Sequence, residues 1–175
     1  MDLTIEIKLV VNSDTASETV AKRFLDRLEE GALTRDENPA SHFGVHFLPY
    51  DPEARKIFIV HHKKSNLWIA PGGHIDRGEG LMGALNREIY EEVGIKNESG
   101  EYATPFLLSI VRIDNTDRLC KEHFDAWYRF PAREGELGTT ASEFYAARWV
   151  TPAEARELIT DPNNLEAVRR TEKLF

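Results

Sequence analysis

Three glutamates within one helical turn are the residues of this chain best suited to chemistry. Glu88, Glu91 and Glu92 follow the spacing i, i+3 and i+4, so a helix over 80–93 places all three on one face. Like charges this close repel one another, and a divalent cation relieves the repulsion. Carboxylate oxygens are ligands that Mg²⁺ prefers. The spacing therefore predicts a magnesium site of the kind that handles phosphate-containing substrates.

The surroundings of the glutamates favour a cleft at the edge of the core. An apolar stripe runs beside them on the predicted helix, formed by Met82, Leu85, Ile89 and Val93. Pro71-Gly72-Gly73 precedes the helix and lets the backbone approach an ion, so the carbonyl of Gly72 is a further candidate ligand. Glu79 lies at the helix start, where the helix dipole favours negative charge. Arg87 is expected to hold Glu79 or Glu91 through charge-assisted hydrogen bonds.

Residues 73–95 match the sequence pattern of the Nudix box at every defining position. Its fixed positions are filled by Gly73, Glu79, Arg87, Glu88, Glu91, Glu92 and Gly94, with Ile89 and Ile95 as the aliphatic residues. Trp68–Gly73 also resembles the strand and loop that lead into this box in the Nudix family, and Glu143–Glu154 resembles the family's late strand and following helix. The resemblance implies an α/β fold, a Nudix-type α/β/α sandwich with a mixed β-sheet, which the predicted mixture of strands and helices also favours.

Resemblance to the Nudix family implies hydrolysis of a nucleoside diphosphate linked to another group, by attack of water on a phosphorus atom. The implied catalytic residues are Glu79, Arg87, Glu88, Glu91 and Glu92, and the implied metal ligands are Gly72, Glu88, Glu91 and Glu92. Glu88 and Glu92 are expected to bind Mg²⁺ directly, with Mn²⁺ as a substitute, whereas Glu91 either binds the ion or helps to activate water. The general base is either a box glutamate or a distal one, for which Glu122 and Glu143 are the candidates.

Several residues outside the glutamate cluster have two possible roles. Lys63 and Lys64 either contact the substrate phosphate or form a solvated basic edge, and Trp127 either stacks on a base or packs in the core. His74 has no second histidine or cysteine at a local spacing that suits zinc, so a structural role is favoured. Cys120 is expected to be an ordinary thiol, because a nucleophilic cysteine needs a basic partner that the sequence does not locate.

Composition narrows the class of protein. The chain has 175 residues, 41% hydrophobic and 30% charged, which suits an ordinary soluble domain. A formal net charge of −8 argues against DNA-backbone binding, but a small phosphate-containing substrate, such as a nucleotide derivative, is compatible because a bound cation reverses the local field. One cysteine excludes an intrachain disulfide. No apolar segment predicts a membrane span or a signal peptide, so the cytoplasm is expected; the oligomeric state is left open.

The hydrophobic pattern predicts one Nudix domain over 1–175, with residues 1–40 as a strand–helix addition. Strands are expected at Leu3–Val11, Phe43–Pro49, Lys56–His62, Leu67–Ile69, Thr104–Ile113, Glu122–Phe130 and Phe144–Val150. Helices are expected from a capping box at Thr15–Glu18 to about Gly31, over 80–93, over Pro152–Leu158 started by Thr151, and over Leu165–Leu174.

Three functions are compatible with these observations. The first is a Mg²⁺-dependent hydrolase of diphosphate linkages, which the complete box favours. The second is a non-catalytic ligand-binding or sensor module on the same fold, although such modules usually have an incomplete box. The third is an isoprenoid-diphosphate isomerase that uses a cysteine and a glutamate; its family departs from the plain box, and only Cys120 is available for that role.

Overall fold

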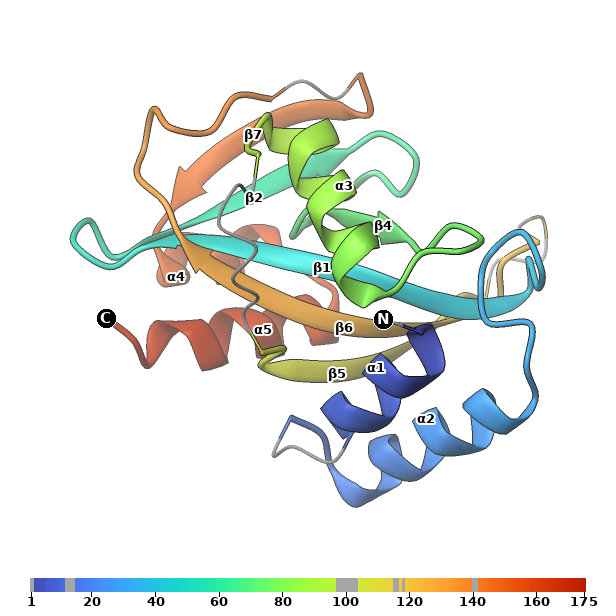
Figure 1. Cartoon of the computed structure of the whole chain (residues 1–175). Helices are drawn as coiled ribbons and strands as arrows, with labels where there is room; N and C mark the ends of the chain where they lie inside the picture. Colours follow the sequence, from blue (N-terminus) through green and yellow to red (C-terminus); the bar gives the residue numbers. More distant parts are fainter. Residues whose placement is uncertain (1, 12–14, 97–103, 115–116, 118, 140–141) are drawn as a thin grey trace. The chain divides into compact units, whose positions relative to one another are not determined.

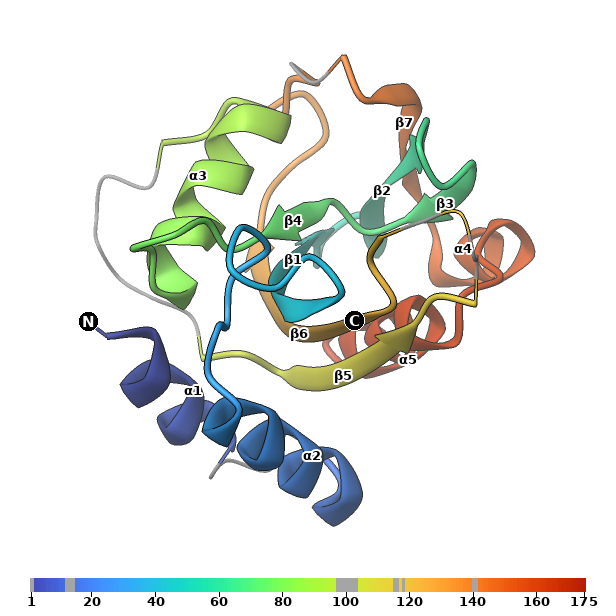
Figure 2. The ribbon, with the colours of Figure 1, turned by 90° about the vertical axis from the view of Figure 1, so that its right-hand side faces the viewer.

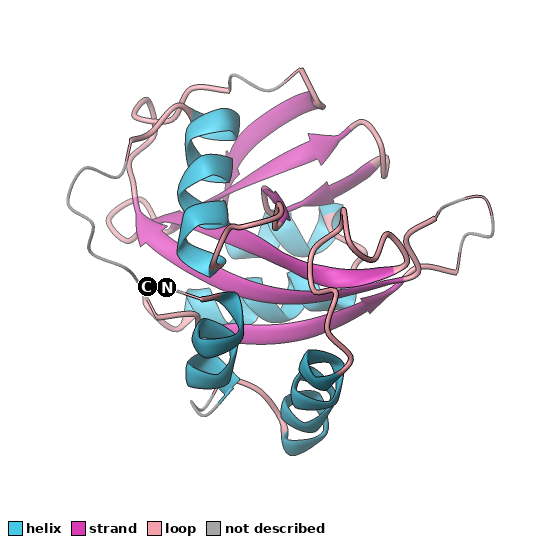
Figure 3. Cartoon of the chain, turned by 45° about the vertical axis from the view of Figure 1, so that its right-hand side comes forward, coloured by secondary structure: helices cyan, strands magenta, loops and turns pink. Residues whose placement is uncertain are grey.

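The computed structural model describes residues 2–11, 15–96, 104–114, 117, 119–139 and 142–175 (Figure 1). The described elements are α1 (Leu3–Val11), α2 (Glu18–Glu29), β1 (Ser41–Asp51), β2 (Lys56–His62), β3 (Leu67–Ile69), β4 (Gly72–His74), α3 (Leu81–Val93), β5 (Leu107–Arg112), β6 (Glu122–Pro131), β7 (Phe144–Val150), α4 (Pro152–Leu158) and α5 (Pro162–Glu172). Helices and strands mix along the chain, so the α/β fold class is confirmed (Figure 3). No helix in the described ranges is long and apolar enough to cross a membrane.

The described strands form one sheet in the order β3-β2-β1-β6-β5, with β4 paired to β1 and β7 paired to β2. β5 and β6 are antiparallel, with Leu107 opposite Trp127. The neighbours β1 and β6 point the same way in Figure 1, so the sheet is mixed, as expected. Pro71-Gly72-Gly73 was expected as a glycine loop; Gly72–His74 form a short strand instead, because β1 offers them a hydrogen-bonding edge.

The chain divides into two compact units. Unit 1 consists of Met1–His46, Gly73–Leu85 and Thr104–Tyr128, and unit 2 of Phe47–Gly72, Asn86–Ala103 and Arg129–Phe175. The elements β1, β4, α3 and β6 contribute residues to both units. The description as a single Nudix domain with an N-terminal addition stays a prediction.

Unit 1 is centred on an aromatic cluster. Phe24 of α2 packs edge-on against Phe43 and Phe124, with ring centroids 5.7 and 5.3 Å away. Helices α1 and α2 lie side by side, and α2 contacts β5 (Figure 2). The buried guanidinium of Arg27 donates to the carbonyls of Gly31 and Ser41 at 2.7 and 2.6 Å. These contacts fasten α2 to the start of β1.

The strand expected over Leu3–Val11 is wrong, because this segment is helix α1. Its alternating apolar residues also contain an i, i+4 series: Leu3, Ile7 and Val11 are buried, whereas Ile5 and Leu9 stay 52% and 61% exposed. The carboxylate of Asp2 accepts the N–H of Thr4 at 2.9 Å and so caps the helix. Packing of one face therefore outweighs the β-propensity of isoleucine and valine.

The next helix begins two residues later than the predicted capping box. Ser17 is the N-cap of α2, and its hydroxyl accepts the N–H of Val20 at 3.3 Å. The hydroxyl of Thr15 instead donates to the carbonyl of Val10 at 3.2 Å. Helix α1 also reaches the box helix, since the carboxylate of Glu6 accepts the N–H of Leu81 at the start of α3.

Unit 2 is built on β2 and its neighbours. β2 pairs antiparallel with β3 and β7, with His61 opposite both Trp68 and Ala146. The bounds expected for β2, β3, β7 and α4 match the structure residue for residue. Thr151 caps α4 with a complete capping box, as expected.

Candidate functional site

Of the three glutamates that share one turn near the end of α3, two are buried. Glu88 is 8% exposed and Glu92 5% exposed, whereas the Glu91 side chain is 55% exposed. The helix turns its apolar stripe inward, so Leu85, Ile89 and Val93 are buried as expected. The glutamates sit next to that stripe, and so the helical periodicity that buries the stripe also buries two of the carboxylates.

The environment of Glu92 opposes its negative charge. Burial, followed by the charges of Glu88, Glu143 and Glu91, raises the pKa of Glu92 to about 9, against a hydrogen bond from the backbone of Gly72. Among the described residues, no hydrogen-bond partner reaches its Oε2 atom. A buried carboxylate oxygen without a partner, surrounded by further carboxylates, fits a hard divalent cation with oxygen ligands.

Arg87 is bound to two of these carboxylates. Its Nη1 lies 2.7 Å from Glu88 Oε1 and 3.3 Å from Glu91 Oε2. The pair with Glu91 was expected, but the pair with Glu88 was not, because adjacent helical residues do not face each other; the long arginine side chain reaches sideways. Glu79 belongs to unit 1, where its Oε2 accepts the N–H of Asp76 at 3.1 Å. A link from Arg87 to Glu79 stays a prediction.

The glycine loop reaches the end of α3 through Gly72. Its φ of +144° is a conformation that side chains rarely adopt, and its N–H is the donor to Glu92. The loop is anchored from two sides: the N–H of Ala70 donates to Asn164 Oδ1 at 2.7 Å, and the carbonyl of Pro71 accepts the N–H of Phe47 at 3.0 Å. Asn164 of α5 lies 94 residues from Ala70, so no sequence signal could have indicated this positioning role.

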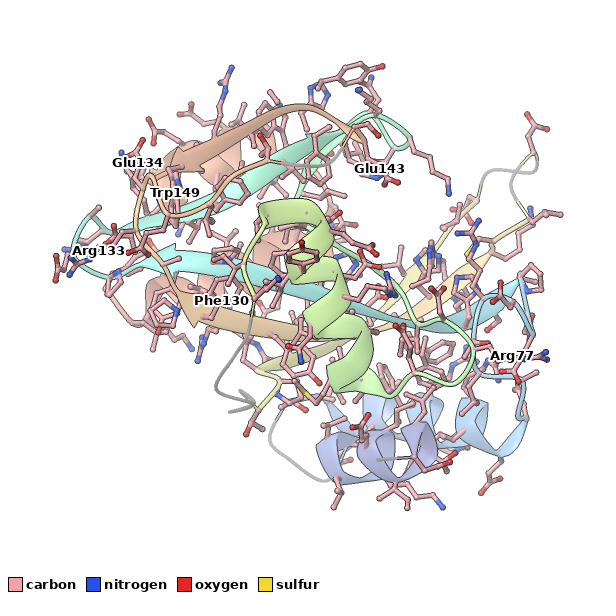
Figure 4. The ribbon with its side chains drawn as sticks, turned by 45° about the horizontal axis from the view of Figure 1, so that its top comes forward. Arg77, Phe130, Arg133, Glu134, Glu143 and Trp149 are labelled. Carbon is pink, nitrogen blue, oxygen red and sulfur yellow. The ribbon has the colours of Figure 1, made fainter. Side chains whose placement is uncertain are left out.

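The two distal base candidates lie in different environments. Glu143 stands at the start of β7 with 69% of its side chain exposed, 3.5 Å from His62 Nε2, and its charge acts on Glu92 (Figure 4). Glu122 belongs to unit 1 and forms ion pairs with Arg23 at 2.8 Å and Arg112 at 3.7 Å. The charge of Glu143 thus acts on the carboxylate cluster of Glu88, Glu91 and Glu92, whereas Glu122 is paired with arginines.

The residues proposed to contact the substrate also lie in different environments. Lys63 donates to the carbonyl of Ser142 and lies 5.9 Å from the ring centroid of Tyr145, whereas Lys64 is exposed. Trp127 is fully buried and donates from Nε1 to Ser109 Oγ at 2.8 Å. The alternative of core packing is therefore confirmed for Trp127, and its buried ring offers no face to a base.

Unit 1 contains a cluster of imidazoles and a thiol that the sequence did not indicate. The ring centroids of His42, His74 and His123 lie 4.8 to 5.0 Å apart. Cys120 Sγ lies 3.7 Å from His42 Nε2, so the thiol does have a basic neighbour. Burial is the main cause that lowers the pKa of His42 to about 4 and that of His74 to about 3. The sequence separates His42 from Cys120 by 78 residues, which is why local spacing missed the cluster.

Known proteins resemble this chain both over a whole domain and over shorter segments. A family model described as NUDIX domain matches residues 40–171. The mouse protein named nucleoside diphosphate-linked moiety X motif 6 is 37% identical over 57 residues, which are 31% of this chain and 18% of that protein. The RNA pyrophosphohydrolase of Actinobacillus pleuropneumoniae serotype 5b is 32% identical over 99 residues, 49% of this chain and 48% of that protein. The chain thus spans less than half the length of these relatives.

Solved structures resemble this chain over most of its length. The NUDIX domain of Shewanella oneidensis NrtR, complexed with ADP ribose, superimposes with a TM-score of 0.61. The similarity covers 77% of this chain and 88% of that domain, at 14% identity. At this identity the similarity concerns the fold alone.

Proposed function

Since this chain belongs to the Nudix family, we propose that it hydrolyses a diphosphate linkage in a nucleoside diphosphate derivative and that it requires Mg²⁺, or Mn²⁺ in its place. The observation that carries this proposal is the buried Glu92, whose Oε2 finds no hydrogen-bond partner among the described residues, beside the buried Glu88. A protein that only packed this helix would gain nothing from two buried carboxylates.

Each box residue has a separate task in this proposal. Glu88 and Glu92 hold the ion, with the carbonyl of Gly72 as a further oxygen ligand, and the Gly72 N–H orients the Glu92 carboxylate. Arg87 keeps Glu88 and Glu91 in place through its two hydrogen bonds. When bound, Mg²⁺ supplies charge neutralisation at the phosphates, a lowered pKa of bound water and orientation of the leaving group.

Glu143 is the distal residue that we favour as the general base. Its side chain is accessible to water, and its charge already acts on Glu92. His62 lies 3.5 Å away, where it can hold the carboxylate in one orientation. Glu91, which is also exposed, is the alternative base or a third ligand. Glu143→Gln and Glu91→Gln separate the two roles, because only loss of the base removes the acidic limb of the pH–rate profile for kcat.

The proposed substrate class is a small nucleotide derivative. The relative named RNA pyrophosphohydrolase and the NrtR domain complexed with ADP ribose support a ligand that contains a nucleoside and a diphosphate. A net charge of −8 disfavours an extended nucleic-acid backbone and leaves local charge reversal to the bound cation. The cytoplasm remains the compartment that we expect.

The proposal is tested with a panel of nucleoside triphosphates, ADP-ribose, other nucleotide sugars, dinucleoside polyphosphates and capped RNA, each with Mg²⁺ or Mn²⁺. Product masses identify the bond that is broken. Wild type is compared with Glu92→Gln and with the matched control Glu157→Gln, which alters an exposed glutamate of α4. We expect turnover of at least one compound by wild type and the control, and its loss in Glu92→Gln and after chelation of the metal.

The same panel, extended by an isoprenoid diphosphate, separates the alternatives. Tight binding of a ligand without turnover by well-folded wild type would replace the hydrolase with a sensor module. Isomerisation of an isoprenoid diphosphate, abolished in Cys120→Ala, would identify the isomerase. Full activity of Glu92→Gln would contradict the proposed ligand set.

A further inference from the structure

We propose that His42, Cys120 and His123 bind a divalent transition metal of the Zn²⁺ class, at a site formed by none of the box glutamates. His42 lies on β1, Cys120 lies two residues before β6, and His123 lies on β6. One ligand atom from each can be chosen so that all three lie within 4.8 Å of one another. Imidazole nitrogen and thiolate sulfur are ligands that Zn²⁺ prefers, and they suit Mg²⁺ poorly.

The separations are close to those of a tetrahedral site. With metal distances of about 2.3 Å for sulfur and about 2.0–2.1 Å for nitrogen, ligand atoms lie about 3.3–3.6 Å apart. Cys120 Sγ and His42 Nε2 are already 3.7 Å apart. The widest separation in the group, 4.8 Å at most, closes by side-chain rotation of the half-buried Cys120 and His123.

His42 is oriented as a metal ligand. It is 0% exposed, and its Nδ1 lies 3.0 Å from the carbonyl of Asn38. A carbonyl only accepts, so Nδ1 carries the proton and the lone pair of the neutral ring is on Nε2, which points to Cys120. Metal-binding histidines usually have such a hydrogen bond at the second nitrogen, because it fixes the tautomer and the ring plane.

A buried carboxylate balances the charge of the proposed site. Asp125 is 1% exposed, and its Oδ2 lies 3.6 Å from His46 Nε2. A divalent ion bound to one thiolate keeps one positive charge, which the Asp125 carboxylate offsets. Gly44 provides room for this carboxylate, since a Cβ atom there would lie 2.5 Å from Asp125 Oδ1.

His74 packs against two of the proposed ligands. Its ring centroid lies 4.8 Å from that of His42 and 5.0 Å from that of His123, and its strand β4 pairs with β1. The ligand atoms that converge belong to His42, Cys120 and His123, so a tetrahedral site built on these three keeps one coordination position open to water or a ligand.

The first test uses the wild-type chain, in which Cys120 is the single cysteine. Alkylation of the thiol by iodoacetamide, followed by mass spectrometry, therefore reports on this site alone. One equivalent of Zn²⁺ should slow alkylation at least about tenfold, because a metal-bound thiolate is a poor nucleophile. Excess Mg²⁺ should leave the rate unchanged. Equal rates with Zn²⁺, with Mg²⁺ and after chelation would overturn the proposal.

The second test follows Co²⁺ binding by its visible and near-ultraviolet absorption. Wild type should bind one equivalent with a thiolate-to-cobalt charge-transfer band. Cys120→Ser should lose that band, and His42→Gln and His123→Gln should weaken binding at least about tenfold. His61→Gln, a half-buried histidine of β2, and Glu92→Gln serve as controls that keep the band. Circular dichroism checks that each variant is folded.

Two results of the second test would reject the site. One is a charge-transfer band that survives in Cys120→Ser, which would assign the absorption to other ligands. The other is loss of the band in Glu92→Gln but not in His42→Gln, which would place the bound ion at the box glutamates.

Discussion

The carboxylate cluster of Glu88, Glu91 and Glu92 and the imidazole–thiol cluster of His42, Cys120 and His123 are built in opposite ways. One helical turn of α3 assembles the first, whereas the second needs β1, β6 and a residue two positions before β6. The first offers hard oxygen atoms, the second nitrogen and sulfur. The difference teaches that a local pattern in a sequence reveals only those ligand sets that one element can assemble.

Burial drives both clusters toward neutrality, with opposite consequences for metal binding. It is the main cause that raises the pKa of Glu92 to about 9 and lowers the pKa of His42 to about 4. A neutral carboxyl must lose its proton to bind an ion, whereas a neutral imidazole already has its lone pair available. Metal binding therefore requires loss of a proton from Glu92 in the carboxylate cluster and from the Cys120 thiol in the imidazole–thiol cluster, whereas the imidazoles bind without losing one.

The largest effect is expected for Glu92→Gln, which should change the activity at the carboxylate cluster and leave the imidazole–thiol cluster unaffected. Loss of a group that merely orients a metal ligand costs about 10–100-fold in activity or affinity, so loss of the ligand itself should lower kcat at least about 100-fold. Protection of Cys120 from alkylation by Zn²⁺ should be unchanged. Steady-state kinetics and alkylation rates on the same preparation check both halves. Loss of both properties together would show that the two clusters are one site.

Gly44→Ala should lower the free energy of unfolding by about 1–3 kcal/mol, because the added Cβ overpacks a filled space beside the imidazole–thiol cluster. That atom would lie 2.5 Å from Asp125 Oδ1 and 3.1 Å from the carbonyl oxygen of Gly73. Urea denaturation measures the change. The matched control is Gly83→Ala on α3, where the nearest atom is Glu79 Cβ at 3.8 Å. The control should gain up to about 1 kcal/mol from helix propensity; equal effects of the two substitutions would contradict the steric argument.

Glu92→Gln should stabilise the metal-free protein by about 0.5–2 kcal/mol, a gain typical of replacing a residue kept for function. Burial and the charge of Glu88 raise the pKa of Glu92 to about 9, so folding near pH 7 must neutralise this carboxyl by proton uptake, and the substitution removes that cost. The Oε2 atom of Glu92 also lacks a hydrogen-bond partner among the described residues. Urea denaturation with a chelator present gives the sign. A less stable variant under these conditions would mean that Glu92 is compensated within the chain.

The smallest effect concerns Glu166, a carboxylate compensated by cations. Hydrogen bonds from Arg169 first, and then from Arg170, lower the pKa of Glu166 to about 2 from 4.5. A lowered folded pKa contributes stability above pH 4.5 that is lost as the pH falls toward 2. Because the group is partly exposed, Glu166→Gln should cost no more than about 1 kcal/mol at pH 7. Urea titrations of both proteins at pH 7 and near pH 2 test this prediction. A difference in free energy of unfolding between them that grows in acid would contradict the predicted direction.

Elements with a strong local pattern were predictable. The capping residue Thr151 and the turns around β2, β3 and β7 are encoded within a few residues, so their bounds were found. The segment Leu3–Val11 was misassigned because its alternation fits a strand and a helix, and only packing in unit 1 decides between them. β4 was missed because a three-residue strand exists only where β1 pairs with it.

By itself, the sequence determined the family, the α/β class and the set of box glutamates, since these depend on residue types at short, regular separations. Only the tertiary structure decided which glutamates are buried, that Asn164 anchors the glycine loop, and that His42 meets Cys120. These three facts arise from contacts between residues far apart in the chain. Hydrogen bonding in the sheet and packing of the core bring such residues together, and no local spacing records that outcome.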